Sequence, residues 1–388
     1  VLAMKCLKEF DTERIAKDEC ERAPLKDVEC LEAAFDVHPS SSDWVAVNFV
    51  SKNIDNLSRF VINTGGSDCL REIVKLLQNR CIDELFLVKL FGTDDVEIEH
   101  VFNALKDTKC TRNHTHTNLT LLSLQSFFLN EEVMTKMYPF FENRHASHLQ
   151  KLSLKRNKIS PSAISKFCEV LDSEHFEELT CLDFSHTPIY DEGARMPFIT
   201  LIKGPRKLTE LDVSQCSLTN QCVPALVKML QSEHCKIAKL SVGDNNIGDE
   251  GVRLLCQNAL TVEHCKLTDL ILNSCLLTEH CISYLCKALQ DARCKLNVLE
   301  LSGNKIGDEG ARVLFEDGIA KEYCKLTMLA LSQNLLTDKC IPRLCKVLRD
   351  ERCKLTKLTL YLNNFTDDGK KDFEKFNGCE DKGLKITI

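Results

Sequence analysis

The sequence lacks the short motifs that carry most nucleotide and hydrolase chemistry. It contains no G-x-x-x-x-G-K-[ST] or G-x-G-x-x-G for phosphate binding, and no H-E-x-x-H or G-x-S-x-G for hydrolysis. These absences argue against an ATPase, a dinucleotide enzyme or a hydrolase. We therefore predict a binding protein, not an enzyme, with no catalytic residue, no cofactor and no metal ion.

Long apolar runs, a secretory leader and an excess of basic residues are also missing. No stretch of 18 apolar residues occurs, so we expect no transmembrane helix and no membrane partner. The formal net charge is −7, which argues against nucleic acid as the main partner. Hydrophobic residues make up 44% of the chain and charged residues 28%, which is typical of an ordered protein with a core.

Cysteine is abundant, with 22 residues, yet no C-x-x-C pair occurs. In a secreted protein such a content would indicate a disulfide framework. Without a secretory leader, the sequence favours reduced thiols and a cytoplasmic location. In that compartment cysteine behaves as a small buried hydrophobe.

A regular repeat runs through most of the chain. Nine blocks follow the pattern L-x-x-L-x-L-x-x-N/C-x-L, and the fourth position of successive blocks recurs every 29 or 30 residues. These positions are Leu122, Leu152, Leu182, Leu211, Leu240, Leu270, Leu299, Leu329 and Leu358. Ile386 marks a further strand, and the stretches around Phe60 and Leu85 predict two degenerate earlier ones. The long gap from Leu85 to Leu122 predicts an inserted loop.

Each block predicts a short strand, a turn and a helix. One such unit cannot bury its own apolar side chains, but stacked units share one continuous core. Because a strand is narrower than a helix, the stack should curve. The predicted fold is an α/β leucine-rich repeat solenoid, a horseshoe with parallel strands on the concave face and helices on the convex face.

Two kinds of repeat alternate. "NNIGDEG" begins at Asn245 and "NKIGDEG" at Asn304, whereas the alternate repeats read "SLTNQC", "LLTEHC" and "LLTDKC", from Ser217, Leu276 and Leu335. The glycines allow backbone angles that other residues resist, and Asp249 and Asp308 are placed to cap the following helices.

This alternation resembles the ribonuclease-inhibitor-like subfamily, and within it the repeat region of NOD-like receptors (NLRs). The motifs "NKIGDEGARVL", "CLLTEHCISYLCKAL" and "HCKLTDLIL" carry the resemblance, although ribonuclease inhibitors share them. The stretches "VLAMKCLKEFD" and "SSDWVAVNFVSKNIDNLSRFVI" are similar to the helical region and repeat entry of NLRs. We therefore expect a helical segment at 1–52 and repeats at 53–388, regular from about 119.

Five cysteines share one repeat position, just before each strand: Cys235, Cys265, Cys294, Cys324 and Cys353. Stacking should place neighbouring Cα atoms about 5 Å apart, within disulfide range. Buried packing residues are the simpler interpretation. The alternative is an oxidation-sensitive ladder, in which thiol oxidants melt the repeat fold.

The strand pattern also predicts a binding surface, because residues between and just after the strand leucines should face the concave side. Among them, basic, acidic and apolar side chains are candidates for partner contact. They are Lys155, Arg156, Asp183, His186, Asp212, Gln215, Asp244, Ile271, Glu300, Tyr361 and Leu362.

By resemblance, the chain is the ligand-sensing and autoregulatory repeat region of a cytosolic innate immune NLR. The implied partners are a protein or pathogen-derived ligand on the concave face and a nucleotide-binding module upstream of Val1. Two alternatives remain: a freestanding inhibitor of the ribonuclease-inhibitor kind, and a repeat-built regulator of a small GTPase. The terminal "CEDKGLKITI" lacks the acidic run expected of the latter.

Overall fold

The computed structural model describes residues 2–3, 30–33, 58–64, 67–78, 82–89, 98–107, 119–142, 146–171, 176–200, 207–376 and 383–388. The chain divides into two compact units, Val1–Thr187 and Pro188–Ile388. Both are built from the same strand–turn–helix repeat, and each is described by itself below.

In the part of unit 1 that the structure describes, seven parallel strands follow one another in chain order. They are β1 (Leu2–Ala3), β2 (Cys30–Ala33), β3 (Arg59–Thr64), β4 (Glu84–Lys89), β5 (Leu121–Gln125), β6 (Lys151–Ser153) and β7 (Cys181–Asp183). The register pairs Phe60 with Leu85, Leu85 with Leu122, and Leu122 with Leu152. The two degenerate strands predicted around Phe60 and Leu85 are therefore confirmed.

The described residues of unit 2 form seven further parallel strands. They are β8 (Glu210–Asp212), β9 (Lys239–Ser241), β10 (Asp269–Ile271), β11 (Val298–Glu300), β12 (Met328–Ala330), β13 (Lys357–Thr359) and β14 (Lys385–Thr387). The predicted repeat leucines face one another across the sheet, from Leu211 beside Leu240 to Leu358 beside Ile386. The expected final strand at Ile386 is confirmed.

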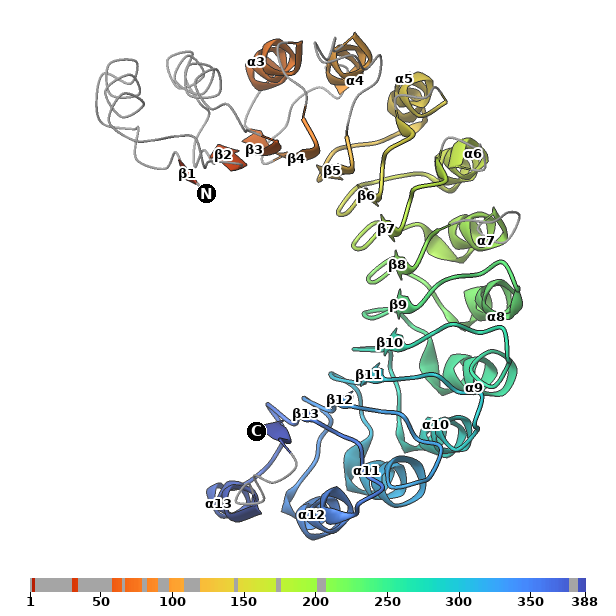
Figure 1. Ribbon diagram of the computed structural model, residues 1–388, viewed down its shortest axis with the longest axis vertical. Coiled ribbons are helices and arrows are strands. Elements are labelled where there is room, and N and C mark those ends of the chain that lie inside the picture. The colour runs from red at the N-terminus through yellow and green to blue at the C-terminus, as the bar shows by residue number, and fades with distance from the viewer. Residues whose placement is uncertain are drawn as a thin grey trace. The chain divides into compact units, whose positions relative to one another are not determined.

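Within each unit the strands line the inner side of the curve and the helices the outer side (Figure 1). The helices among the described residues of unit 1 are α3 (Ser67–Gln78), α4 (Ile98–Asp107), α5 (Glu131–Phe141) and α6 (Pro161–Leu171). Those of unit 2 are α7 (Tyr190–Thr200), α8 (Val223–Gln231), α9 (Gly248–Asn258), α10 (Ile282–Leu289), α11 (Gly307–Val313), α12 (Ile341–Arg349) and α13 (Asp367–Phe376). The predicted leucine-rich repeat solenoid is confirmed.

The two units fill their cores differently. In unit 1 a cluster of aromatic rings packs between neighbouring helices: Phe102, Phe140, Phe141, Phe167 and Phe176. In unit 2 the core consists mainly of leucines and cysteines. Helix α8 shows how a helix joins it, because Val223, Leu226, Val227 and Leu230 are all buried.

The alternation of repeat types has a structural basis at the start of each helix. Repeats with the L-T-x-x-C sequence, here called cysteine repeats, open with a 3-10 turn: η6 (Asn220–Cys222), η7 (Glu279–Cys281) and η9 (Asp338–Cys340). Repeats with I-G-D-E-G, here called glycine repeats, enter the helix directly. Gly248 has a φ of +62°, and a Cβ on Gly251 would lie 2.6 Å from the Ile247 side chain. Glycine at 248 therefore avoids backbone strain, and glycine at 251 leaves room for the Ile247 side chain.

Each glycine repeat of unit 2 also holds the cysteine repeats on both sides. The Asn304 Oδ1 accepts hydrogen bonds from the Cys275 and Leu277 N–H groups of the preceding repeat, at 2.9 and 3.0 Å. The Asp308 carboxylate accepts from the N–H and hydroxyl of Thr337 in the following repeat. Asp249 contacts Thr278 in the same way. The prediction that Asp249 and Asp308 cap their own helices is wrong, because α9 and α11 have no side-chain cap.

The first 52 residues were expected to be helical. Most of this segment lies outside the described residues, so the division at residue 52 stays a prediction. Its described residues are strands, however: β1 pairs with β2 and β2 with β3, so that Leu2, Leu31 and Phe60 stand in one register. The strand pattern therefore begins before the first repeat that the sequence indicated.

Candidate interaction surface

The outward side of each strand presents a column of side chains along the sheet. The middle residue of the strand is buried in the core, as with Leu211, Leu240 and Leu270, which are at most 1% exposed. Its two neighbours point the other way because side chains alternate along a strand. A further column follows in the turn after each strand.

All eleven predicted contact residues lie in these outward or turn positions. Unit 1 carries Lys155, Arg156, Asp183 and His186, and unit 2 carries Asp212, Gln215, Asp244, Ile271, Glu300, Tyr361 and Leu362. Arg156, Gln215, Asp244, Tyr361 and Leu362 are exposed, and the others are partly exposed. Their contact with a partner stays a prediction.

The turn residues adopt a backbone conformation that the sequence did not reveal. Arg156, His186, Gln215, Asp244 and Leu362 all have φ between 52° and 58°, in the left-handed region. In Arg156, Gln215 and Asp244 the backbone N–H bonds to the next repeat, as from Gln215 to the Gly243 carbonyl at 2.8 Å. The sheet hydrogen bonding thus continues into the turn and fixes the direction of these side chains.

Sequence reasoning missed one outward column, the first residue of each strand. In unit 2 it consists of Glu210, Lys239, Asp269, Val298, Met328, Lys357 and Lys385. Val298 and Met328 are neighbours across β11 and β12, and both are partly exposed. Strict alternation about the buried leucine predicts this column and could have found it.

Charge changes sign along the outward face of unit 2. Glu210, Asp212, Asp244, Asp269 and Glu300 lie on β8 to β11 or in their turns, and Lys239 there approaches Glu210 at 3.9 Å. Lys357 and Lys385 lie on β13 and β14. Between them, Ile271, Val298 and Met328 provide an apolar area. A partner with a basic side, an apolar centre and an acidic side would complement this face.

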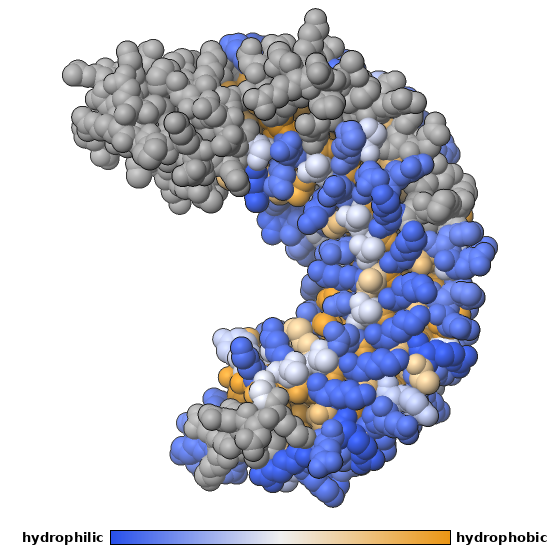
Figure 2. Space-filling model, in the orientation of Figure 1, coloured by the Kyte–Doolittle hydropathy of each residue, from blue (hydrophilic) through white to orange (hydrophobic). Residues whose placement is uncertain are grey.

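Several of the acidic groups are already oriented by hydrogen bonds. The Asp183 carboxylate accepts from the Ser153 hydroxyl and from the Ser185 N–H, both at 2.8 Å. Glu300 accepts from the Asn273 side chain at 2.7 Å. The face is therefore preorganised, which reduces the conformational entropy lost on binding. In the visible part of unit 2, hydrophilic residues cover most of the surface (Figure 2).

The five cysteines before the strands are buried, at 2–8% exposure, and the described cysteines are free thiols. Burial is the main cause that raises the thiol pKa of Cys235, Cys265, Cys294 and Cys324. At Cys294 the pKa rises to about 11. A protonated, buried thiol is a poor nucleophile. The expected role as buried packing residues is consistent with this, and the response to oxidants stays a prediction.

Among the described residues, no group of three or more His, Cys, Asp or Glu side chains could hold a metal ion. No helix within the described ranges is long and apolar enough to cross a membrane.

Comparison with known proteins agrees with the repeat architecture. The Leucine Rich repeat family matches residues 145–168, 233–256 and 293–315. The chain has the leucine-rich repeat solenoid fold, and its repeats are similar to those of ribonuclease inhibitors. Pig (Sus scrofa) ribonuclease inhibitor is 31% identical to it over 223 residues, which are 57% of this chain and 47% of the inhibitor. The fold also resembles one in the crystal structure of the yeast Rad7 and Elc1 complex, with a TM-score of 0.60, 17% identity, and coverage of 96% of this chain and 86% of that one.

The repeats are also similar to those of NLR proteins, as the sequence motifs indicated. NACHT, LRR and PYD domains-containing protein 3 of Rattus norvegicus is 30% identical over 280 residues, covering 64% of this chain and 26% of the relative. Protein 7 of the same series from Homo sapiens is 31% identical over 238 residues, covering 61% and 24%. This leucine-rich repeat chain thus spans about a quarter of the length of these relatives.

Proposed function

We propose that this chain is the non-catalytic repeat region of a cytosolic NLR. There it would bind a protein partner or pathogen-derived ligand and restrain a nucleotide-binding module in the same polypeptide. Release would occur by a population shift, when a ligand binds better to the active state than to the inactive one. The similarity to NACHT- and LRR-containing relatives is the observation that carries this proposal.

The outward face of the strands is the proposed binding surface. Its support is geometric: charged and apolar side chains stand in fixed columns, at positions the core does not use. The candidate residues in unit 2, from Asp212 to Leu362, combine acidic groups with an apolar end. The division into a helical segment at 1–52 and repeats at 53–388 is part of the same proposal.

The decisive experiment is to read the transcript upstream of the Val1 codon and then to express the full-length protein. We expect G-x-x-x-x-G-K-[ST] in the upstream sequence, and faster ATP turnover when residues 1–388 are deleted. If the motif is present but deletion leaves turnover unchanged, restraint by the repeats is wrong while the family assignment stands.

A start codon directly upstream would instead favour a freestanding inhibitor, for which the similarity to ribonuclease inhibitor provides support. That alternative has its own assay, because a stoichiometric amount of the chain should then suppress ribonuclease activity. A regulator of a small GTPase ranks after both, and accelerated GTP hydrolysis would be its sign.

A further inference from the structure

Leu276 and Leu335 form a matched pair of exposed side chains at one edge of unit 2. They occupy the same position in two cysteine repeats, each six residues after the buried strand leucines Leu270 and Leu329. They are 60% and 55% exposed, and Leu276 is the most exposed large hydrophobic side chain in the described part of the chain. Both lie beyond the outward strand columns, in the loop that leads to the helix.

Folding alone does not explain leucine at these two positions. Both residues have a positive φ, 60° at Leu276 and 63° at Leu335, a region that side chains with a Cβ disfavour. Ser217 stands at the same position in the preceding cysteine repeat with a φ of 58°. The fold therefore needs this backbone conformation but not leucine. An apolar side chain that is both exposed and strained points to a contact outside the chain.

A lysine stands between the two leucines. The Lys305 N–H donates to the carbonyl of Leu277, next to Leu276, at 2.8 Å. Two residues later, the Gly307 N–H donates to the carbonyl of Asn334, next to Leu335, at 2.9 Å. Lys305 is exposed, and no ion pair involves it within the described ranges. The edge thus presents leucine, lysine and leucine on three consecutive repeats.

The spacing of these side chains matches one face of an α-helix. Neighbouring strands lie about 4.8 Å apart, so Leu276 and Leu335 are separated by about 10 Å along the sheet direction. Residues i and i+7 of a helix are about 10.5 Å apart on one face, with i+3 and i+4 between them. Two apolar residues seven apart would therefore meet both leucines, and the residues between them would meet Lys305.

We propose that Leu276, Lys305 and Leu335 form a docking edge for an acidic amphipathic helix of a partner protein. Charge selects the acidic helix over a basic one. Asp308, three residues after Lys305, is occupied by Thr337, and the charges of the flanking turns, Glu279 on one side and Lys339 on the other, offset each other. This edge is separate from the outward strand face, so it goes beyond the function proposed above.

The test is a displayed library of helical peptides, randomised at positions i, i+3, i+4 and i+7 and selected on the complete 388-residue chain. The comparison variant is Leu276→Ser/Leu335→Ser, because Ser217 already occupies this position. A second variant, Lys305→Glu, reverses the central charge. We expect enriched peptides with apolar residues at i and i+7 and an acidic residue between them. Their affinity should fall at least tenfold on the serine variant, and Lys305→Glu should reverse the charge preference.

Urea unfolding of the double serine variant tests whether its loss of binding reflects loss of the fold. Because Ser217 already adopts the left-handed conformation at this position and the two leucines are exposed, the urea midpoint of Leu276→Ser/Leu335→Ser should stay close to that of the wild type. The proposal is overturned if no peptides enrich, if enriched peptides bind the serine variant equally well, or if they are basic. Self-association of the wild type that the serine variant loses would also overturn it, in favour of a second copy of the chain.

Discussion

At the residue scale, the asparagine in the turn after the strand joins two neighbouring repeats by hydrogen bonds as well as forming the turn. Asn304 is 3% exposed, and its amide group donates to the carbonyls of Leu272 and Leu301 at 2.9 and 2.8 Å. With the two bonds its Oδ1 accepts, one side chain satisfies backbone groups of two repeats. Asn157 at the equivalent position in unit 1 uses only its amide N–H groups, and its Oδ1 has no partner within the described residues.

We therefore predict that Asn304→Ala is strongly destabilising. The substitution leaves buried backbone N–H and C=O groups without partners, and we expect the free energy of unfolding to fall by about 3 kcal/mol. Urea denaturation of the complete chain measures it. Asn246→Ala is the matched control, because this asparagine, next to the equivalent Asn245 in another glycine repeat, is exposed, and its effect should stay within about 0.5 kcal/mol. Equal losses in the two variants would contradict the role assigned to Asn304.

The raised pKa of the buried thiols leads to a second prediction at the residue scale. Burial raises the pKa of Cys275, Cys286 and Cys340 to about 12, whereas a thiol in an unfolded chain titrates near about 8.5. A raised folded-state pKa means that stability is fully present below about pH 8.5 and is lost as pH rises towards about 12. Urea midpoints should therefore fall between pH 8 and pH 10.

Because other groups also titrate in this range, a single-thiol variant isolates the effect. Cys294→Ala removes a thiol whose pKa burial raises to about 11. The free energy of unfolding of this variant should depend less steeply on pH than that of the wild type. Parallel pH profiles would show that the thiol does not contribute.

At the scale of elements, periodicity determined where the strands lie but not how neighbouring repeats are fastened. All nine predicted repeat leucines are buried residues within strands. They could be predicted because the 29- or 30-residue period and the two-residue strand alternation are both visible in the sequence. The clamp from Asp308 to Thr337 was not foreseen, because it joins residues 29 positions apart through a partly buried side chain. The left-handed turn residues were missed for a similar reason: Leu362 and Asp244 share a backbone conformation but no side-chain property.

The Asp308 clamp predicts an unequal effect of two adjacent acidic residues. Asp308→Ala removes both acceptors of Thr337 and should lower the free energy of unfolding by about 2 kcal/mol. Glu309→Ala, one residue later, should cost clearly less, because this carboxylate is exposed and water screens its ion pair. Thermal or urea unfolding of the two variants side by side gives the comparison, and a larger loss for Glu309→Ala would refute it.

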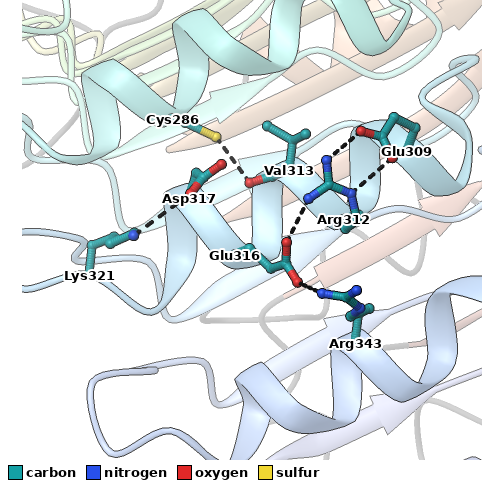
Figure 3. A network of polar contacts seen from close by, with 8 residues as sticks. All are labelled: Cys286, Glu309, Arg312, Val313, Glu316, Asp317, Lys321 and Arg343. Carbon is teal, nitrogen blue, oxygen red and sulfur yellow. Dashed lines mark hydrogen bonds and ion pairs between the residues drawn. The ribbon is translucent and has the colours of Figure 1, made fainter.

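The small effect expected at Glu309 follows from the network to which it belongs (Figure 3). Arg312 pairs with Glu309 and Glu316, and Glu316 also pairs with Arg343 on α12. Arg312 and Arg343 are 37% and 55% exposed, so water screens these pairs. The equivalent Arg253 in α9 bonds to Gln257 where Arg312 has Glu316. One repeat thus already replaces the second carboxylate with an amide.

At the scale of the whole molecule, the two units differ in how oxidation should affect them. Of the described cysteines, only Cys30, Cys168 and Cys181 lie in unit 1, where aromatic rings fill the core. The remainder lie in unit 2, and the register of the strands that follow them places Cys265 beside Cys294 and Cys324 beside Cys353. A disulfide between two such neighbours would displace side chains that pack against the next repeat, and interiors this dense transmit strain.

We therefore predict that diamide treatment removes amide hydrogen-exchange protection from unit 2 before unit 1. Because repeats contact only their neighbours, damage should spread along β9 to β13 and leave the aromatic cluster around Phe141 protected. Exchange measured by mass spectrometry at increasing oxidation resolves the order. A variant with Cys265 and Cys294 both replaced by Ala should delay the loss. Full protection after quantitative oxidation, or equal loss in both units, would refute the prediction and leave the five cysteines as packing residues alone.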